Sequence, residues 1–147
     1  MKFACSVEIN LPVSRVIEIF YNDDYLPEWQ EGFLSKELLS GVKGEVGAKS
    51  RIIFHVRKQT MELTETILSK NLPVEMTSLF EHIHMTNTMR NCFIFVGESK
   101  TKIEIHIDYT KFNGFVPKAM SVLMPGLFKR QTQNMFDRFK VFAEKLK

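Results

Sequence analysis

Cysteine is scarce in this chain of 147 residues, and its scarcity excludes two classes of protein. Cys5 and Cys92 lie far apart in the sequence, and neither belongs to a motif with metal-binding or redox spacing. Two cysteines also cannot form a framework of several disulfides. We therefore expect neither a disulfide-rich scaffold nor a cysteine-based metal site.

Long apolar runs and strong net charge are absent as well. No segment reaches the about 20 apolar residues that a membrane-spanning helix needs, and residues 1–6 predict the start of a strand, not a signal peptide. The net charge is only +3, with basic and acidic residues interspersed. Nucleic-acid binding typically needs a concentrated basic stripe with stacking aromatics. We expect a cytoplasmic protein with no nucleic-acid partner and no integral membrane segment.

Tryptophan and tyrosine are rare, whereas the chain has thirteen Phe and eight Met. Phe and Met fill space without polar partners, and Met adapts to irregular shapes. The chain is 44% hydrophobic and 25% charged, which is typical of a globular domain, and it is long enough for one continuous core. We predict a single domain over residues 1–147, whose apolar interior is either an ordinary core or a space for a guest molecule.

The last part of the chain has the apolar periodicity of a helix. No proline or glycine follows Gly126, and the apolar residues after it recur on one helix face. The stripe consists of Phe128, Met135, Phe139, Phe142 and Leu146, widened by Leu127, Phe136 and Ala143. The pattern predicts a helix over residues 126–146 of about 31 Å, which needs a large apolar surface to lie on.

The sequence before this helix predicts one strand, two short helices and about six further strands. Alternation from Phe3 to Ile9 predicts the first strand, and Pro12 marks the first turn of a helix over residues 13–20. A second short helix or turn covers 25–29. The remaining strands are predicted at 33–40, 50–57, 60–69, 74–84, 87–96 and 101–111, with a glycine-rich loop at 41–47.

Three connections predict how the later strands pair. Turns at 58–59, at 85–86 and over 98–100 place Phe54 opposite Leu63, Ile52 opposite Glu65, Phe80 opposite Asn91, His82 opposite Met89, Phe93 opposite Ile105 and Met89 opposite Tyr109. These registers gather apolar residues on one face and put Glu81, Arg90 and Asp108 in a row on the other. We expect an antiparallel sheet with an apolar concave face under the C-terminal helix and a largely charged opposite face.

This order of elements, with three short motifs, resembles the START-like superfamily (SRPBCC), and most of all its polyketide cyclase/dehydrase and lipid-transport branch. The motifs are INLPVSRV at 9–16, LPEW at 26–29 and GEVG at 44–47, and they mark scaffold turns. The resemblance implies an α+β helix-grip (START-like/Bet v 1-like) fold, in which a curved antiparallel sheet wraps around a long C-terminal helix. It also implies a hydrophobic cavity for a lipid, hormone, polyketide or other apolar molecule, with no cofactor. A minority of members catalyse cyclisation or hydrolysis, and no catalytic signature assigns a residue here.

Glu65 and His82 are the candidate catalytic residues. Glu65 shares a strand face with Met61 and Leu63, so its carboxylate is expected within an apolar wall, where it must pair, take up a proton or reach water. In one register His82 lies diagonally across from it. The two could act as general acid and base, or Glu65 could anchor a ligand. The alternative is a structural carboxylate that reaches solvent or bonds to Ser78.

The histidines do not predict a metal site. His82 and His84 are two apart on one predicted strand and would share its inner face. Zinc needs a third and a fourth ligand, whereas His55 and His106 are expected on the opposite face. We expect the first two to be polar groups at the cavity rim or to be satisfied by the backbone, with no metal bound.

The predicted binding site combines the apolar sheet face with the segment before the long helix. Pro117 begins a short helix whose Met120 and Met124 are expected over the cavity mouth, either as an adaptable lid or as ordinary packing. A membrane-surface role for this helix has weak support, because it is short and carries only Lys118 before Lys129. An apolar cavity with a few polar groups is the usual small-molecule site. The predicted ligand-binding residues are Phe54, Met61, Leu63, Glu65, Phe80, His82, Met89, Asn91, Phe93, Ile105, Tyr109, Met120, Met124, Phe128 and Met135.

Three functions fit these observations. The leading hypothesis is a non-enzymatic protein that holds a hydrophobic or amphipathic small molecule, lipid- or polyketide-like, between sheet and helix. The second is a cyclase/aromatase-type enzyme that uses Glu65 and His82 as acid and base. The third is a protein-interaction module with a filled core and an exposed apolar patch.

Overall fold

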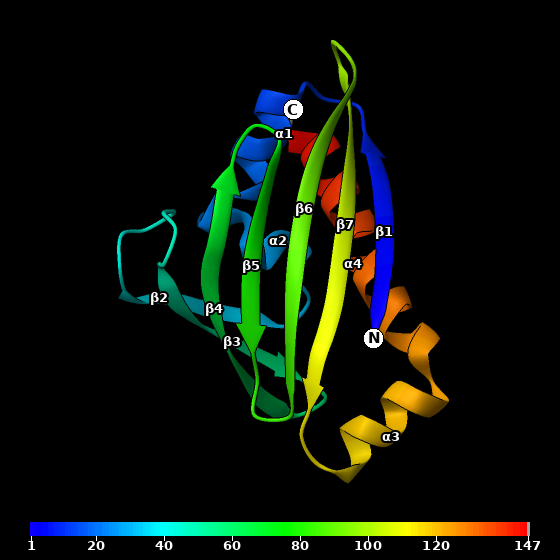
Figure 1. Ribbon diagram of the computed structural model, residues 1–147. Coiled ribbons are helices and arrows are strands. Elements are labelled where there is room, and N and C mark those ends of the chain that lie inside the picture. Colours follow the sequence, from blue (N-terminus) through cyan, green and yellow to red (C-terminus); the bar gives the residue numbers. More distant parts are fainter. Residues whose placement is uncertain (147) are drawn as a thin grey trace.

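A computed structural model describes residues 1–146 as one antiparallel sheet with helices α1, α2 and α4 behind it (Figure 1). The seven strands lie in the order β1-β7-β6-β5-β4-β3-β2. No helix in this part of the chain is long and apolar enough to cross a membrane. The elements are β1 (Lys2–Ile9), α1 (Val13–Phe20), η1 (Asp23–Tyr25), α2 (Leu26–Trp29), β2 (Phe33–Ser40), β3 (Lys49–Val56), β4 (Gln59–Asn71), β5 (Glu75–Glu81), β6 (Met85–Gly97), β7 (Lys100–Phe112), α3 (Phe115–Leu123) and α4 (Pro125–Leu146).

This architecture is the α+β helix-grip fold that the sequence predicted. A curved sheet holds a long C-terminal helix on its inner face, and the two short helices follow the first strand (Figure 1). The strand at residues 33–40 and the helix at 13–20 have the predicted bounds, and the other elements differ at their ends.

Helix α4 buries a narrower stripe than the sequence predicted. Its buried residues are Phe128, Thr132, Phe136, Phe139 and Ala143, which lie three or four positions apart on one helix face. Met135 and Phe142 of the predicted stripe are half-buried, and Leu146 is exposed. The apolar stripe was broad enough to allow several orientations, and packing against β1 selected one of them.

Helix α4 also bonds to the free edge of the sheet. The side chain of Gln133 donates from Nε2 to the Ser6 carbonyl at 2.9 Å, and Lys140 donates from Nζ to the Glu8 carbonyl at 2.6 Å. Both carbonyls belong to β1, the edge strand beside β7. An edge strand otherwise presents unpaired backbone groups. These bonds therefore satisfy the edge and fix the helix along it.

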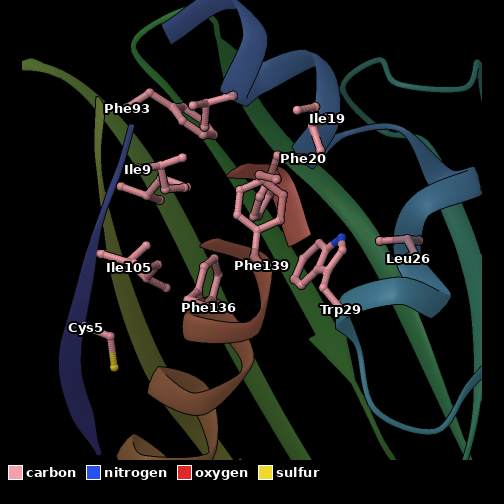
Figure 2. Close-up of a cluster of buried hydrophobic side chains, with 14 of the residues drawn as sticks. Cys5, Ile9, Ile19, Phe20, Leu26, Trp29, Phe93, Ile105, Phe136 and Phe139 are labelled. Atoms are coloured by element: carbon pink, nitrogen blue, oxygen red, sulfur yellow. The ribbon is translucent and has the colours of Figure 1, made fainter. Parts of the chain in front are cut away.

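The fully buried core lies between α4, the short helices α1 and α2, and strands β1, β6 and β7 (Figure 2). Phe20 of α1 is near its centre, with its ring centroid 5.2 Å from that of Phe139 and 5.8 Å from those of Phe93 and Phe136. Trp29 of α2 packs edge-on against Phe139 at 5.0 Å. Rings at these separations leave this part of the interior filled.

The three predicted strand registers are wrong, although the predicted faces are correct. Phe54 pairs with Met61 instead of Leu63, Phe80 pairs with Asn87 instead of Asn91, and Phe93 pairs with Ile103 instead of Ile105. Each pairing is displaced by an even number of residues. Because side chains alternate between faces with period two, an even displacement leaves these paired residues on their predicted face.

The turns explain these displacements. The β3–β4 turn is formed by Arg57 and Lys58, both with positive φ, one residue earlier than predicted. The β5–β6 turn lies at Ile83 and His84, because His82 and Met85 already exchange backbone hydrogen bonds. The prediction that His82 and His84 share the inner face of a strand is therefore wrong.

The outer face of the sheet differs from the prediction in the same way. Arg90 lies opposite Thr77 and His106, and its guanidinium pairs with Glu75 at 3.1 Å. Asp108 lies opposite Thr88. The predicted row of Glu81, Arg90 and Asp108 does not form, because it depended on the displaced registers.

The sheet has two dissimilar ends. The β3–β4 and β5–β6 turns and the exit of β7 into α3 lie at one end, which we call the α3 end (Figure 1). The β4–β5 and β6–β7 turns lie at the opposite end, near α1, which we call the α1 end. Helix α3 stands out beyond the sheet, next to the first turns of α4 (Figure 1).

Candidate ligand-binding site

The inner face of the sheet carries a row of mixed side chains across five strands. Cross-strand pairing places Ser50, Glu65, Phe80, Asn87 and Tyr109 side by side, from β3 to β7. Neighbouring side chains in such a row are about 4.5–5.5 Å apart at their Cβ atoms. The row lies nearer the α3 end than the packed core does.

The predicted binding residues divide into a packed group and a half-buried group. Phe93 and Ile105 belong to the packed core behind α4 (Figure 2), and Asn91 and Phe128 are also buried. Met89, Tyr109 and Met135 are half-buried and rest against that core, and Met120 on α3 is half-buried. Met124 is exposed.

The side chains on β3, β4 and β5 are the most open of the predicted set. Phe54, Met61, Leu63 and Phe80 are half-buried and lie outside both buried clusters of the described residues. They share one face of the sheet, because Phe54 pairs with Met61, and because Leu63 and Phe80 lie on the same face as Glu65, which is two residues from Leu63 and opposite Phe80. This region is an apolar surface that a molecule from solvent can reach.

Glu65 is neutralised by a lysine that the sequence analysis did not select. Lys36 Nζ lies 3.2 Å from Glu65 Oε1 and 3.2 Å from Asp23 Oδ1. Burial lowers the pKa of Lys36, but the two carboxylates more than compensate, so the pKa is raised overall. The charged partner of Glu65 is therefore Lys36 of β2, which also pairs with Asp23 of η1.

His82 is not the partner of Glu65 in this structure. Its Nδ1 accepts a hydrogen bond from the backbone N–H of His84 at 3.2 Å, within the β5–β6 turn. Burial and the neighbouring His84 lower the pKa of His82. No hydrogen bond or ion pair among the described residues joins it to Glu65. The acid–base arrangement of these two residues thus lacks a direct contact.

Two buried polar atoms without partners lie between the packed core and the open surface. Among the described residues, neither the Tyr21 hydroxyl nor Asn91 Oδ1 has a hydrogen-bond partner. Asn91 is only 7% exposed and lies opposite Met76 and Ile105. An unsatisfied buried polar group costs about 1–3 kcal/mol. These two atoms are therefore exceptions among the buried polar atoms of the described residues.

The surroundings of Tyr21 connect these atoms with Glu65. Burial raises the pKa of Tyr21. Asn91 lies close enough to lower it in part, although the two side chains do not meet hydrogen-bond geometry, and the Glu65 carboxylate raises it further. Tyr21 thus lies near Asn91 and within the electrostatic influence of Glu65, and we call these three residues the polar cluster. Lys36 completes it through its ion pair with Glu65.

Aromatic rings close the site on the β7 side. Tyr109 stacks with Phe112 at 5.6 Å and packs edge-on against Phe128 of α4 at 5.0 Å. Phe3 of β1 stacks on the other side of Tyr109 at 6.1 Å. Burial raises the pKa of Tyr109. This corner joins the sheet to the first turns of α4.

Several residues of the site were missed by sequence reasoning. Tyr21, Lys36 and Asn87 face the interior, and Trp29 Nε1 is a third buried atom without a partner among the described residues. The sequence did carry a signal for Lys36. Side chains alternate between the two faces of a strand, so Lys36 and Glu37 on the strand at 33–40 had to face opposite sides. Tyr21 gave no signal, because it follows the end of a helix and its direction depends on the fold.

Other features of the structure lie outside the inner face of the sheet. The residues described contain no group of three or more His, Cys, Asp or Glu side chains arranged to hold a metal. Two shallow surface hollows lie elsewhere, one lined by Asp137, Arg138 and Val141 and one by Asn10, Pro12 and Arg15.

No protein-family model matches the chain, and neither does the sequence of any curated protein. Solved structures do match it over nearly its whole length. A START superfamily protein from Mycobacterium smegmatis is 13% identical with a TM-score of 0.82, over 99% of both chains. The Zhui aromatase/cyclase from Streptomyces sp. R1128 is 12% identical with a TM-score of 0.75, over 99% of this chain and 94% of that one.

A third similar structure is Ara h 8.0201, which is 11% identical with a TM-score of 0.76, over 97% of both chains. Similarity at these identities shows the fold alone, because one fold carries many functions. The curved sheet, the gripped C-terminal helix and these neighbours together identify the chain as a protein with the START-like (SRPBCC) helix-grip fold.

Proposed function

We propose that the protein binds a hydrophobic or amphipathic small molecule on the inner face of its sheet, with the polar end of the molecule at the polar cluster. The apolar part would lie along the half-buried side chains of β3, β4 and β5, including Phe54, Leu63 and Phe80. A mostly apolar surface with a few convergent polar groups is the usual form of a small-molecule site.

The observation that carries this proposal is the pair of partnerless atoms on Tyr21 and Asn91. Nearly all buried polar atoms in proteins have a hydrogen-bond partner, so each exception needs a reason. A ligand hydroxyl could bond to both atoms, because it can accept from the Tyr21 hydroxyl and donate to Asn91 Oδ1. The nearby Lys36–Glu65 pair adds a charged group of each sign.

Extraction of the purified protein tests the proposal in general form. We expect native mass spectrometry to detect an adduct, and organic extraction to release an apolar molecule with one polar group. A protein that carries no adduct and does not take up any member of a panel of fatty acids, sterols and aromatic polyketides would contradict the proposal.

Asn91→Leu tests the polar anchor. Removing an unsatisfied amide from an apolar site should leave the free protein as stable or more stable, whereas the ligand loses a hydrogen bond. We expect affinity to fall about 2- to 10-fold, measured by isothermal titration calorimetry with the extracted ligand. Ser78→Ala on the neighbouring strand is the matched control, because Ser78 is about as buried as Asn91 but lies opposite Met89, outside the row of Asn91. Equal affinity in Asn91→Leu and the native protein would exclude Asn91 as the anchor.

A further inference from the structure

Helix α3 is an apolar helix that the fold leaves uncovered. It has no buried residue. Phe115 and Leu123 are 86% and 78% exposed, and Val116, Val122 and Met124 are exposed as well. Most apolar side chains of α3 therefore face solvent, and soluble proteins rarely expose contiguous apolar patches unless something else covers them.

An exposed apolar side chain from the sheet, Ile83, adjoins this helix. Ile83, at the tip of the β5–β6 turn, is 76% exposed. The turn is tied to the start of α3, because Asn113 donates from its backbone N–H to the His84 carbonyl at 2.7 Å. The Asn113 side chain also lies 3.4 Å from the Ile83 carbonyl. Ile83 and α3 therefore form one exposed apolar surface, which we call the apolar tip.

The charge around the apolar tip has one dominant sign. Between Asp108 and Asp137 the chain has four basic residues, namely Lys111, Lys118, Lys129 and Arg130, and no acidic residue. All four are exposed, and no ion pair among residues 1–146 involves them. The β3–β4 turn adds Arg57 and Lys58 at the same end of the sheet (Figure 1). Glu81 and Glu62 are exposed acidic residues at this end, and Glu62 is paired with Arg51, so the basic residues outnumber the acidic ones.

We propose that the apolar tip docks onto a bilayer that contains anionic phospholipid. Phe115, Leu123 and Ile83 insert at the level of the headgroups, and Lys111 and Lys118 contact the lipid phosphates. An apolar face flanked by basic residues binds in this way through both buried apolar area and electrostatic attraction. A neutral apolar partner or a second copy would not account for the excess of positive charge, since two copies would bring like charges together.

This docking is separate from the proposed binding of a small molecule. It uses residues outside the sheet, whereas the ligand proposal uses the inner face. Neither proposal needs the other to be correct.

Vesicle flotation tests the docking with the full chain. We expect the protein to float with vesicles of phosphatidylcholine and phosphatidylglycerol, to stay in solution with phosphatidylcholine alone, and to be released by salt. Leu123→Glu should lower the bound fraction about tenfold or more by placing a charge in the apolar tip. Lys111→Glu/Lys118→Glu should lower it by a similar factor, because both charges attract the anionic surface.

Phe95→Glu is the matched control. Phe95 is 68% exposed but belongs to β6 near the α1 end, so its substitution should leave flotation unchanged. Circular dichroism checks that every variant keeps its fold. The proposal is overturned if the native protein stays in solution with anionic vesicles at low salt, or if Phe95→Glu weakens flotation as much as Leu123→Glu. It is also overturned if lipid-free protein forms a dimer that Leu123→Glu abolishes, because a second copy then covers the tip.

Discussion

At the scale of single residues, Lys36 decides the state of the polar cluster. It is the cation between Glu65 and Asp23, and its side chain is only 21% exposed. Charges in such a position lose hydration, and the loss is offset only when oppositely charged partners are close. The pair therefore holds β2 against β4 and η1 while keeping polar groups on an otherwise apolar face.

Replacing Lys36 tests this role. We expect Lys36→Met to lower the free energy of unfolding in urea by about 1–3 kcal/mol, because Glu65 loses its cation in a partly buried site. The double variant Lys36→Met/Glu65→Leu should recover most of that loss, since no unpaired charge remains. A double variant no more stable than the single one would contradict the role of the ion pair.

The same pair predicts a dependence on pH. The pKa of Lys36 is raised from its ordinary 10.5 in the folded protein. A raised pKa contributes stability that is fully present below the unfolded value and is lost as pH rises through the folded value. The difference in stability between the native protein and Lys36→Met should therefore be constant from about pH 7 to about pH 10 and shrink at higher pH.

At the scale of elements, the β3–β4 turn shows a local conflict between sequence and structure. Arg57 and Lys58 have φ of 51° and 64°, in the left-handed region that favours glycine. Two-residue hairpins with positive φ at both positions usually carry Asn-Gly or Asp-Gly. This chain keeps two basic residues there, which the docking proposal places at the charged α3 end.

Lys58→Gly should therefore stabilise the hairpin. Removing the side chain from a left-handed residue relieves about 1 kcal/mol, which thermal unfolding monitored by circular dichroism can detect. Gln59→Gly, the next residue and the first of β4, should have the opposite effect, because glycine weakens a strand. A loss of stability in Lys58→Gly would show that the turn has another conformation.

At the scale of the whole molecule, one aromatic cluster joins elements from both ends of the chain. Phe139 of α4 is fully buried and packs on Phe20 of α1 and Trp29 of α2. The N-terminal helices and the C-terminal helix therefore depend on one another. We infer that the chain unfolds as a single cooperative unit, as small single domains usually do.

Phe139→Ala tests this dependence. Truncation of a buried Phe should lower the free energy of unfolding by about 3–5 kcal/mol, measured in urea by both fluorescence and circular dichroism. Val141→Ala, on the exposed face of the same helix, should change it by less than about 0.5 kcal/mol. If the two signals showed separate transitions in the native protein, the single-unit description would be wrong.

The sequence by itself determined the order of the elements and the face to which most side chains in the strands point. Apolar periodicity is a local property, so it located α4 from Phe128 to Ala143 and the inner faces of β3 to β7. When a strand register shifts by an even number of residues, each side chain stays on the same face of the sheet. Leu63, Glu65 and Asn91 therefore face inward, although their predicted partners were wrong.

Only the tertiary structure decided which residues meet. The registers depended on turns at Arg57–Lys58 and Ile83–His84, whose conformation is set by the sheet around them. The partner of Glu65 comes from β2, and the polar cluster gains Tyr21 from the end of α1. Pairing energies act across space between residues distant in the chain, so no local pattern encodes them.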